Sequence, residues 1–304
     1  MIVRVLGTAA GGGLPQWNCR CNNCRSARAG EMAVRMQASI AVSSDGDHWL
    51  LVNATTDIRR QMELLPPQPS APARGTPVNA VLLTDANIDH AGGLLELRQS
   101  PVTRIFSSAQ VRDALAGANP IFAPFARGDR RWSVFDASLN ETSVADVGPD
   151  LRVTAIDVPG LMPSFAGGAE SRGAATAFVI EEPATQARVL YSPVFLRPND
   201  ALVAAAQRCD AVFLDGSFWS DDELPAHGLG ERTARQMGHA PIGGENGWLK
   251  TFGMVNGAVR SHRYCTHVNN SNPVLDPQSA EARVLRDAGY ALPDDGMELD
   301  LGAR

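Results

Sequence analysis

One short segment, residues 84–93, constrains the fold and function of this chain more than any other. An apolar run with strand character, VNAVLLT, leads into TDANIDHAGG, and AGGLLELRQS continues with helical spacing. The segment therefore predicts a loop at the end of a buried strand that carries Asp85, Asn87, Asp89 and His90. Carboxylates beside an imidazole on such a loop are typical of a metal-binding site.

The rest of the chain predicts strands separated by a few helices. Short apolar or alternating runs predict strands at 2–6, 39–44, 49–54, 79–84, 151–158, 176–182, 187–193 and 210–216. Helical spacing occurs at 56–65 and 198–208. Two strand-rich halves, each with helices, predict two sheets packed face to face with helices outside. We therefore expect an α+β fold, a four-layer αββα sandwich, as a single domain over 1–304.

The composition argues against several classes of protein. A net charge of −6 does not favour a nucleic-acid partner. No apolar run approaches the roughly 18 residues that indicate a membrane-spanning helix. The first residues, MIVRVLGTAAGGG, have too short an apolar run for a secretory signal and predict a strand instead. We therefore expect a cytoplasmic protein that does not insert into a membrane.

Three closely spaced cysteines predict a second metal site, in a Cys-rich loop at 17–25. The run WNCRCNNC places Cys19, Cys21 and Cys24 within six residues. In a chain without a secretory leader, this clustering favours a metal over disulfides. Thiolates suit Zn²⁺, and a closed site with four ligands would be structural. The spacing leaves the fourth ligand open among Cys265, His262 and His239.

The loop at 84–93 resembles the signature T-H-x-H-x-D-H-x-G-G of the metallo-β-lactamase superfamily. Asp85 and Asn87 stand where the signature has its first two histidines, and the remaining signature positions are filled by Thr84, Asp89, His90, Gly92 and Gly93. The superfamily binds two metal ions. No histidine lies between His90 and His227, and Ser192 stands near the place expected for the bridging aspartate. The resemblance therefore implies that one of the two metal sites is lost.

The other site keeps its ligands. The resemblance implies a site formed by Asp89, His90 and a distal histidine, for which His267 in RYCTHVNNSNP is the candidate. Two imidazoles and one carboxylate form the facial ligand set of non-haem Fe(II) oxygenases, which leaves positions open for substrate and O₂. Zn²⁺ with a bound water would fit the same ligands, so iron and zinc both remain open.

Further segments along essentially the whole chain resemble the coenzyme pyrroloquinoline quinone (PQQ) biosynthesis protein B family. These are GTAAGGGLPQWNCRCNNC, LLVNATTDIR, FLDGSFWSDDEL, MGHAPIGG and THVNNSNP. The resemblance implies catalytic Fe²⁺ and structural Zn²⁺, and an oxygenase that uses O₂ to hydroxylate the tyrosine of a Glu-Tyr unit from a peptide precursor. Two alternatives are a carrier that assists transport of PQQ or its precursor to the periplasm, and a metal-dependent hydrolase. Contact with other PQQ-biosynthesis proteins is a further expectation, and the oligomeric state stays open.

Residues beyond the three ligands are expected to support this chemistry. Asp85 and Asp215 are expected to accept hydrogen bonds from imidazole N–H groups. Asn87 is likewise expected to support the ligands without binding the metal itself. His239, in GHAP, is expected to act as an acid or base or to orient the substrate, with a packed loop histidine as the equal alternative. For the aromatic residues a core role is favoured over a pocket wall: Trp17, Trp219 and Phe218.

Overall fold

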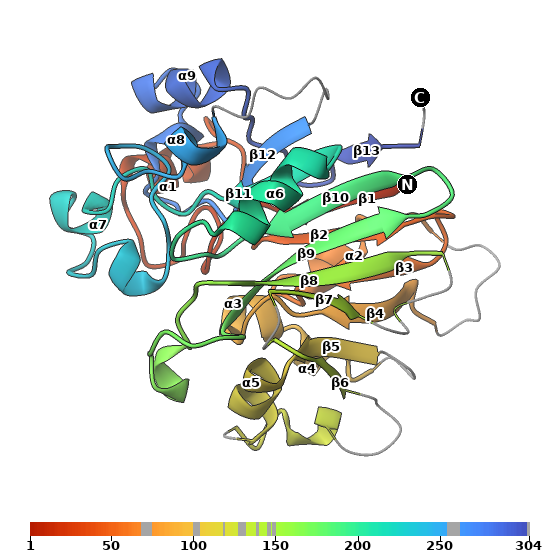
Figure 1. The fold of residues 1–304 in the computed structure, drawn as a ribbon. Helices are drawn as coiled ribbons and strands as arrows, with labels where there is room; N and C mark the ends of the chain where they lie inside the picture. Colours follow the sequence, from red (N-terminus) through yellow and green to blue (C-terminus); the bar gives the residue numbers. More distant parts are fainter. Residues whose placement is uncertain are drawn as a thin grey trace.

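Two β-sheets packed face to face form the centre of the computed structural model (Figure 1). The structure describes residues 1–67, 75–99, 104–117, 119–126, 132–137, 140–144, 147, 150–253 and 262–302. Helices cover the outer face of each sheet, so the expected αββα arrangement is confirmed.

The first sheet contains seven strands in the order β13-β1-β2-β3-β4-β5-β6. Their bounds are β1 Ile2–Gly7, β2 Ser39–Ser43, β3 Trp49–Val52, β4 Val78–Leu82, β5 Arg104–Ser108, β6 Trp132–Phe135 and β13 Glu298–Asp300. In this order, the neighbouring pairs from β13 as far as β3 are antiparallel, and those from β3 as far as β6 are parallel. In the β3–β4 register, Leu51 lies opposite Val81.

The second sheet contains six strands in the order β12-β11-β10-β9-β8-β7. Their bounds are β7 Glu141–Val144, β8 Arg152–Val158, β9 Ala175–Glu182, β10 Ala187–Ser192, β11 Ala211–Asp215 and β12 His262–Thr266. Strands β7 to β10 are antiparallel, and β10, β11 and β12 are parallel. Val212 of β11 lies opposite Leu190 on one side and Arg263 on the other.

Three apolar clusters hold these layers together. The cluster between the sheets includes Val5 and Phe106 from the first sheet and Phe178 and Phe213 from the second. Figure 1 shows α6, α8 and α9 on one side of the sandwich and α3, α4 and α5 on the other. The helices are α1 Asn22–Ala29, α2 Ile58–Met62, α3 Ile88–Ala91, α4 Leu94–Leu97, α5 Ala109–Arg112, α6 Asp200–Arg208, α7 Glu223–Ala226, α8 Leu249–Phe252 and α9 Ala280–Asp287.

The strands predicted from the sequence match observed strands to within two residues at each end. Helix α2 is shorter than the predicted 56–65 at both ends, and before its start the backbone N–H and hydroxyl of Thr56 bond to the side chain of Gln37. Helix α1 was not predicted. It begins directly after Cys21 and ends at Gly30, whose φ of 76° is left-handed. The segment 17–25 is therefore a loop only as far as Cys21.

The loops after strands β1, β4, β11 and β12 meet at one edge of the sandwich. Two backbone bridges join the sheets there, between Asp85 and Ala175 and between Ala9 and Val268. Strands β4, β11 and β12 end at this edge, and the parallel pairing of β11 and β12 brings the residues that follow them together. This edge carries the candidate functional site.

Candidate metal centre and active site

Asp85 holds the loop after β4 in place. Its Oδ2 accepts hydrogen bonds from Thr84 Oγ1 at 2.8 Å and His90 Nδ1 at 2.6 Å. Its Oδ1 accepts from the backbone N–H and the side-chain amide of Asn87 at 2.9 and 2.8 Å. Because an ionised carboxylate only accepts, His90 carries its proton on Nδ1 and leaves the Nε2 lone pair free. Asp85 and Asn87 are thus both engaged in ordering the loop.

Three side chains converge beside this loop. Asp89 and His90 lie on α3, and His267 directly follows β12. One ligand atom from each lies within 4.8 Å of the other two. His267 Nε2 is 3.2 Å from Asp89 Oδ2, and His90 Nε2 is 3.9 Å from the same oxygen. The structure therefore brings together the three residues that the sequence analysis grouped from distant parts of the chain.

Two features show that this group fits a cation. His90 is fully buried, yet its Nε2 has no hydrogen-bond partner among the described residues, whereas buried polar atoms are normally bonded. Gly11, after β1, lies so close that a Cβ there would stand 3.1 Å from Asp89 Oδ2. Because His90 Nε2 is unbonded and Gly11 has no side chain, an ion can lie between them and Asp89. Fe²⁺ and Zn²⁺ both accept two imidazoles and a carboxylate.

The charges around this group favour a cation. Burial raises the pKa of Asp89, but the imidazoles of His90 and His267 outweigh it and hold the pKa well below its usual range. Burial lowers the pKa of His90, but the carboxylates of Asp85 and Asp89 outweigh it and raise the pKa to about 9. Burial lowers the pKa of His267. A metal would replace the proton that the carboxylates attract to His90.

His267 has a backbone conformation that is uncommon outside glycine. Its φ is 58°, in the left-handed region, which costs such a residue roughly 1–2 kcal/mol. Ser217 Oγ lies 2.7 Å from His267 Nδ1, and the N–H of Val268 donates to the Thr8 carbonyl at 2.8 Å. These contacts from two other strand ends hold the conformation that presents Nε2 to Asp89.

Ser217 connects His267 to Asp215 and His239. Its Oγ lies 2.6 Å from Asp215 Oδ1, 2.7 Å from His267 Nδ1 and 3.0 Å from His239 Nδ1. His239 Nδ1 lies 2.8 Å from Asp215 Oδ2. The three ionisable groups are also close enough to share an ion, but the Ser217 hydroxyl fills the space between them. We therefore interpret this cluster as a hydrogen-bond network.

The network fixes the orientation of His239. Burial lowers the pKa of His239, but the carboxylate of Asp215 outweighs it and raises the pKa. Because Asp215 accepts at Nδ1, the other ring nitrogen of His239 is free. The His239 ring stacks on the His267 ring with centroids 5.1 Å apart, yet His239 is not in the group formed by Asp89, His90 and His267.

A cavity of about 410 Å³ opens beside the metal centre. Asp89, His239 and His267 contribute to its wall. The apolar part of the wall includes Leu161, Met162, Phe165, Val194, Phe218 and Met237. The volume lies within the range of small-molecule sites.

The three aromatic residues considered in the sequence have different places. Phe218 is buried and lines the cavity over the metal centre. Trp219 packs against the apolar cluster outside the second sheet, close to Gly243. Trp17 is 85% exposed, so the core role expected for it is wrong. Its place on the cysteine loop explains this, because that loop packs through its cysteines.

The cysteine cluster forms a second candidate metal site. The Sγ atoms of Cys19, Cys21 and Cys24 lie within 4.8 Å of one another. Cys19 Sγ accepts from the Cys21 N–H at 3.4 Å and the Asn270 amide at 3.1 Å. Burial raises the pKa of Cys21, but hydrogen bonds, including those from Cys24 and Asn270, outweigh it and lower the pKa. A lowered pKa favours the thiolate, which is the form that binds metals, at Cys21, whereas burial raises the pKa of Cys24 to about 12, so its proton would have to be displaced by the metal.

None of the three candidates for a fourth ligand joins the thiols in the described part of the chain. Cys265 is fully buried in the core, His239 belongs to the Ser217 network, and His262 is exposed and stacked on Tyr264. His227, which the sequence analysis did not consider, lines a surface cavity together with Cys21.

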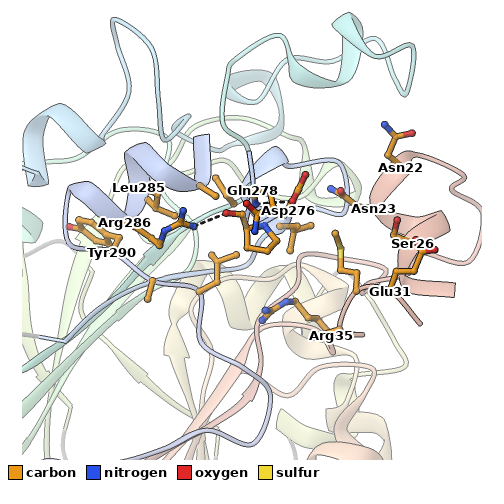
Figure 2. Close-up of a pocket in the computed structure, with 18 residues that line it drawn as sticks. Asn22, Asn23, Ser26, Glu31, Arg35, Asp276, Gln278, Leu285, Arg286 and Tyr290 are labelled. Atoms are coloured by element: carbon orange, nitrogen blue, oxygen red, sulfur yellow. Dashed lines mark hydrogen bonds between the residues drawn. The ribbon is translucent and has the colours of Figure 1, made fainter. Parts of the chain in front are cut away.

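A larger cavity of about 730 Å³ lies elsewhere, between α1 and α9. Figure 2 shows Asn22 and Ser26 on one side of it and Arg286 and Tyr290 on the other. Among the described residues that line this cavity, none is a candidate site residue. Size alone would therefore have pointed away from the side chains that can bind a metal.

Three residues that shape the metal centre were missed in the sequence. Gly11 leaves space at Asp89, and Ser217 bonds to His267. Asn53, with a left-handed φ of 65°, accepts from the N–H of Thr84 at 3.0 Å. The available signal was positional, because each follows a strand at the same edge of the fold.

Within the described ranges, every helix is too short or too polar to cross a membrane. Residues 48–266 match the model of the Beta-lactamase superfamily domain. Coenzyme PQQ synthesis protein B of Pseudomonas putida (strain W619) is 35% identical, with 99% of this chain and 100% of that protein covered. The Klebsiella pneumoniae protein of the same name is 34% identical, with 99% and 98% covered.

Solved structures agree with this fold. The crystal structure of Zn²⁺-bound PqqB from Methylobacterium extorquens superposes with a TM-score of 0.88 at 35% identity, and the alignment covers 99% of this chain and 100% of that one. A diphosphatase from the PhnP family has a TM-score of 0.62 at 18% identity, with 98% and 97% covered, which shows a shared fold alone.

Proposed function

This chain belongs to the coenzyme PQQ synthesis protein B family, and from that membership we propose that it is a metal-dependent enzyme of PQQ biosynthesis. We further propose that it binds Fe²⁺ and hydroxylates the tyrosine ring of a Glu-Tyr unit with O₂: one oxygen atom enters a ring C–H bond, and the other leaves as water with two electrons from an external reductant of the ascorbate class. The observation that carries this proposal is the buried, unpartnered Nε2 of His90, which faces Asp89 and His267 beside a cavity of small-molecule size.

Bound Fe²⁺ would supply positions at which O₂ is activated, because the three protein ligands leave coordination sites open. The protein prepares those ligands. Asp85 holds the proton of His90 at Nδ1, and Ser217 accepts the proton of His267 at Nδ1. Both Nε2 lone pairs then face Asp89. Such partners fix the ring orientation and raise the basicity of the ligands.

His239 is the proposed acid or base. Asp215 holds its Nδ1 proton, so its Nε2 can accept the phenol proton of a bound tyrosine. His239 lies on the cavity wall beside His267 but outside the ligand group, which suits proton transfer to a substrate rather than metal binding. The apolar wall, including Phe218 and Met162, would hold the aromatic ring and exclude water from it.

The loop after β4 argues against a two-metal hydrolase. Asp85 and Asn87 replace the signature histidines. The side chain of Asp85 accepts hydrogen bonds from the Asn87 amide and from His90 Nδ1. Two-metal hydrolysis needs a pair of ions that clamp the reacting oxygens. A single ion with open positions fits redox chemistry with O₂ better. We assign the cysteine cluster to a structural Zn²⁺, since thiolates suit that ion.

The test is a reconstitution under nitrogen with Fe²⁺, followed by addition of O₂, ascorbate as the two-electron reductant and the dipeptide Glu-Tyr. We expect O₂ uptake and a product with one added oxygen atom. His90→Ala and His267→Ala should abolish both while the circular dichroism spectrum is retained, and His262→Ala, an exposed histidine, should serve as the matched control. The proposal fails if Fe²⁺ produces no oxygenated peptide, and release of a hydrolysed product with two ions bound outside the cysteines would instead support a hydrolase.

A further inference from the structure

Arg232 is the only lysine or arginine among the described residues that line the cavity over the metal centre. The arginines near it in sequence or space are occupied. Arg197 pairs with Glu170 through two contacts of 3.1 and 2.5 Å, and Arg235 donates to two backbone carbonyls. Arg232 is exposed and has no hydrogen-bond or ion-pair partner in the part of the chain that the structure describes. Its guanidinium is therefore available to a ligand.

The backbone that carries Arg232 is well ordered by hydrogen bonds. The N–H of Thr233 donates to Gln236 Oε1 at 3.0 Å, and the N–H of Gln236 donates to Thr233 Oγ1 at 3.3 Å. The N–H of His239 donates to the Ala234 carbonyl at 2.9 Å. One compact turn thus presents both Arg232 and His239 to the same cavity, so the position of the cation relative to the proposed acid or base is set before a ligand binds.

The cavity wall indicates the chemistry of the ligand. Its apolar side chains suit an aromatic ring, and the metal ligands lie on one part of the wall. Arg232 adds a planar cation whose N–H groups match a carboxylate in a bidentate arrangement. A ligand with a phenol and a separate carboxylate would contact all three features.

We propose that Arg232 binds a carboxylate of the substrate and thereby orients the phenol ring toward Asp89, His90 and His267. This inference rests on the function proposed above, because it names how that substrate is held. A Glu-Tyr unit offers two carboxylates, one on the glutamate side chain and one at the C-terminus. Both carboxylates can accept the same hydrogen bonds from a guanidinium, so the experiment determines which of them Arg232 binds.

The experiment measures binding without turnover, by calorimetry under nitrogen with the metal-loaded protein. Three peptides are titrated: Glu-Tyr, Gln-Tyr, which lacks the side-chain carboxylate, and the C-terminal amide of Glu-Tyr. Each is titrated into wild type, Arg232→Gln, Arg232→Lys and the control Arg60→Gln. Arg60 is an exposed residue of α2 outside the cavity wall.

We expect wild type and the Arg60 variant to bind Glu-Tyr about tenfold more tightly than one of the two modified peptides. Arg232→Gln should bind Glu-Tyr about tenfold more weakly than wild type and should no longer discriminate between the peptides. Arg232→Lys keeps the charge but not the paired N–H donors of the guanidinium, so its affinity for Glu-Tyr should lie between those of wild type and Arg232→Gln. The inference is overturned if Arg232→Gln still discriminates, if it weakens all three peptides equally, or if wild type binds none of them. Failure of the oxygenase proposal is seen separately, as peptide binding without an oxygenated product.

Discussion

Asn23 connects the cysteine cluster to the loop that carries His267. It lies on α1 between two of the clustered cysteines, and its Nδ2 donates to the carbonyls of Asn270 and Asn272 at 3.0 Å each. These carbonyls follow His267 closely in the chain. We predict that Asn23→Ala weakens metal binding at the Asp89, His90 and His267 group without removing any ligand.

The magnitude follows from the contacts. Two neutral hydrogen bonds contribute about 1–3 kcal/mol together. The left-handed conformation of His267 costs roughly 1–2 kcal/mol, so a loop freed from α1 can relax by a similar amount. If about half of the lost hydrogen-bond energy, about 1 kcal/mol, is transmitted to His267, metal affinity at that site falls about fivefold.

The assay is a competition titration of Fe²⁺ against a chelator under nitrogen, with the cysteine cluster already loaded with Zn²⁺. Asn22→Ala is the matched control, because Asn22 is an exposed neighbour on α1 whose side chain accepts a bond from Arg25. The reasoning is refuted if Asn23→Ala and Asn22→Ala bind Fe²⁺ within twofold of each other. Loss of Zn²⁺ from the cysteines would be detected in parallel by metal analysis.

Three further changes test the surroundings of the site and one buried carboxyl. Gly11→Ala places a Cβ about 3.1 Å from Asp89 Oδ2 without a disfavoured φ, so Fe²⁺ affinity should fall about tenfold at unchanged thermal stability, and an unaltered affinity would contradict the assigned space. Ser217→Ala removes the acceptor of the His267 ring proton and should lower Fe²⁺ affinity by about 10- to 100-fold in the same titration; an effect below twofold would count against it. Burial raises the pKa of Asp295 to about 6 in the folded protein, above its unfolded value, so its contribution to stability is greatest in acid and is lost as pH rises. Between about pH 4.5 and 7, the free energy of unfolding in urea should therefore decrease by about 2 kcal/mol more for wild type than for Asp295→Asn. Equal pH dependence of the two proteins would disprove this.

The fold was predicted well where local pattern and tertiary packing agree. The alternating run before residue 158 and the apolar run before Asp85 became β8 and β4, because their side chains pack into the sandwich core. Short edge strands such as β6 and β7 were missed. Several of their residues are exposed, so the apolar signal is weak there.

The candidate site was predicted in its ligands but not in its surroundings. Asp89 and His90 are adjacent in a recognisable loop, and His267 follows a strand pattern near the end of the chain. Ser217 gave no comparable signal, because serines after strands are common and only its contacts distinguish it.

The sequence by itself determined the sandwich of strands and helices and the cysteine triplet, and it predicted a ligand set of one carboxylate and two imidazoles. The sandwich follows from side-chain periodicity and the triplet from cysteines close together in the chain, whereas the ligand set came from the resemblance of two distant segments to a known family. The tertiary structure decided which partners contact each candidate ligand, that Ser217 lies within hydrogen-bonding distance of Asp215, His239 and His267, and that Arg232 shares a cavity with Asp89 and His267. These relations join residues that only the packing of the two sheets and their loops brings within hydrogen-bonding distance, so spacing along the chain carries no record of them.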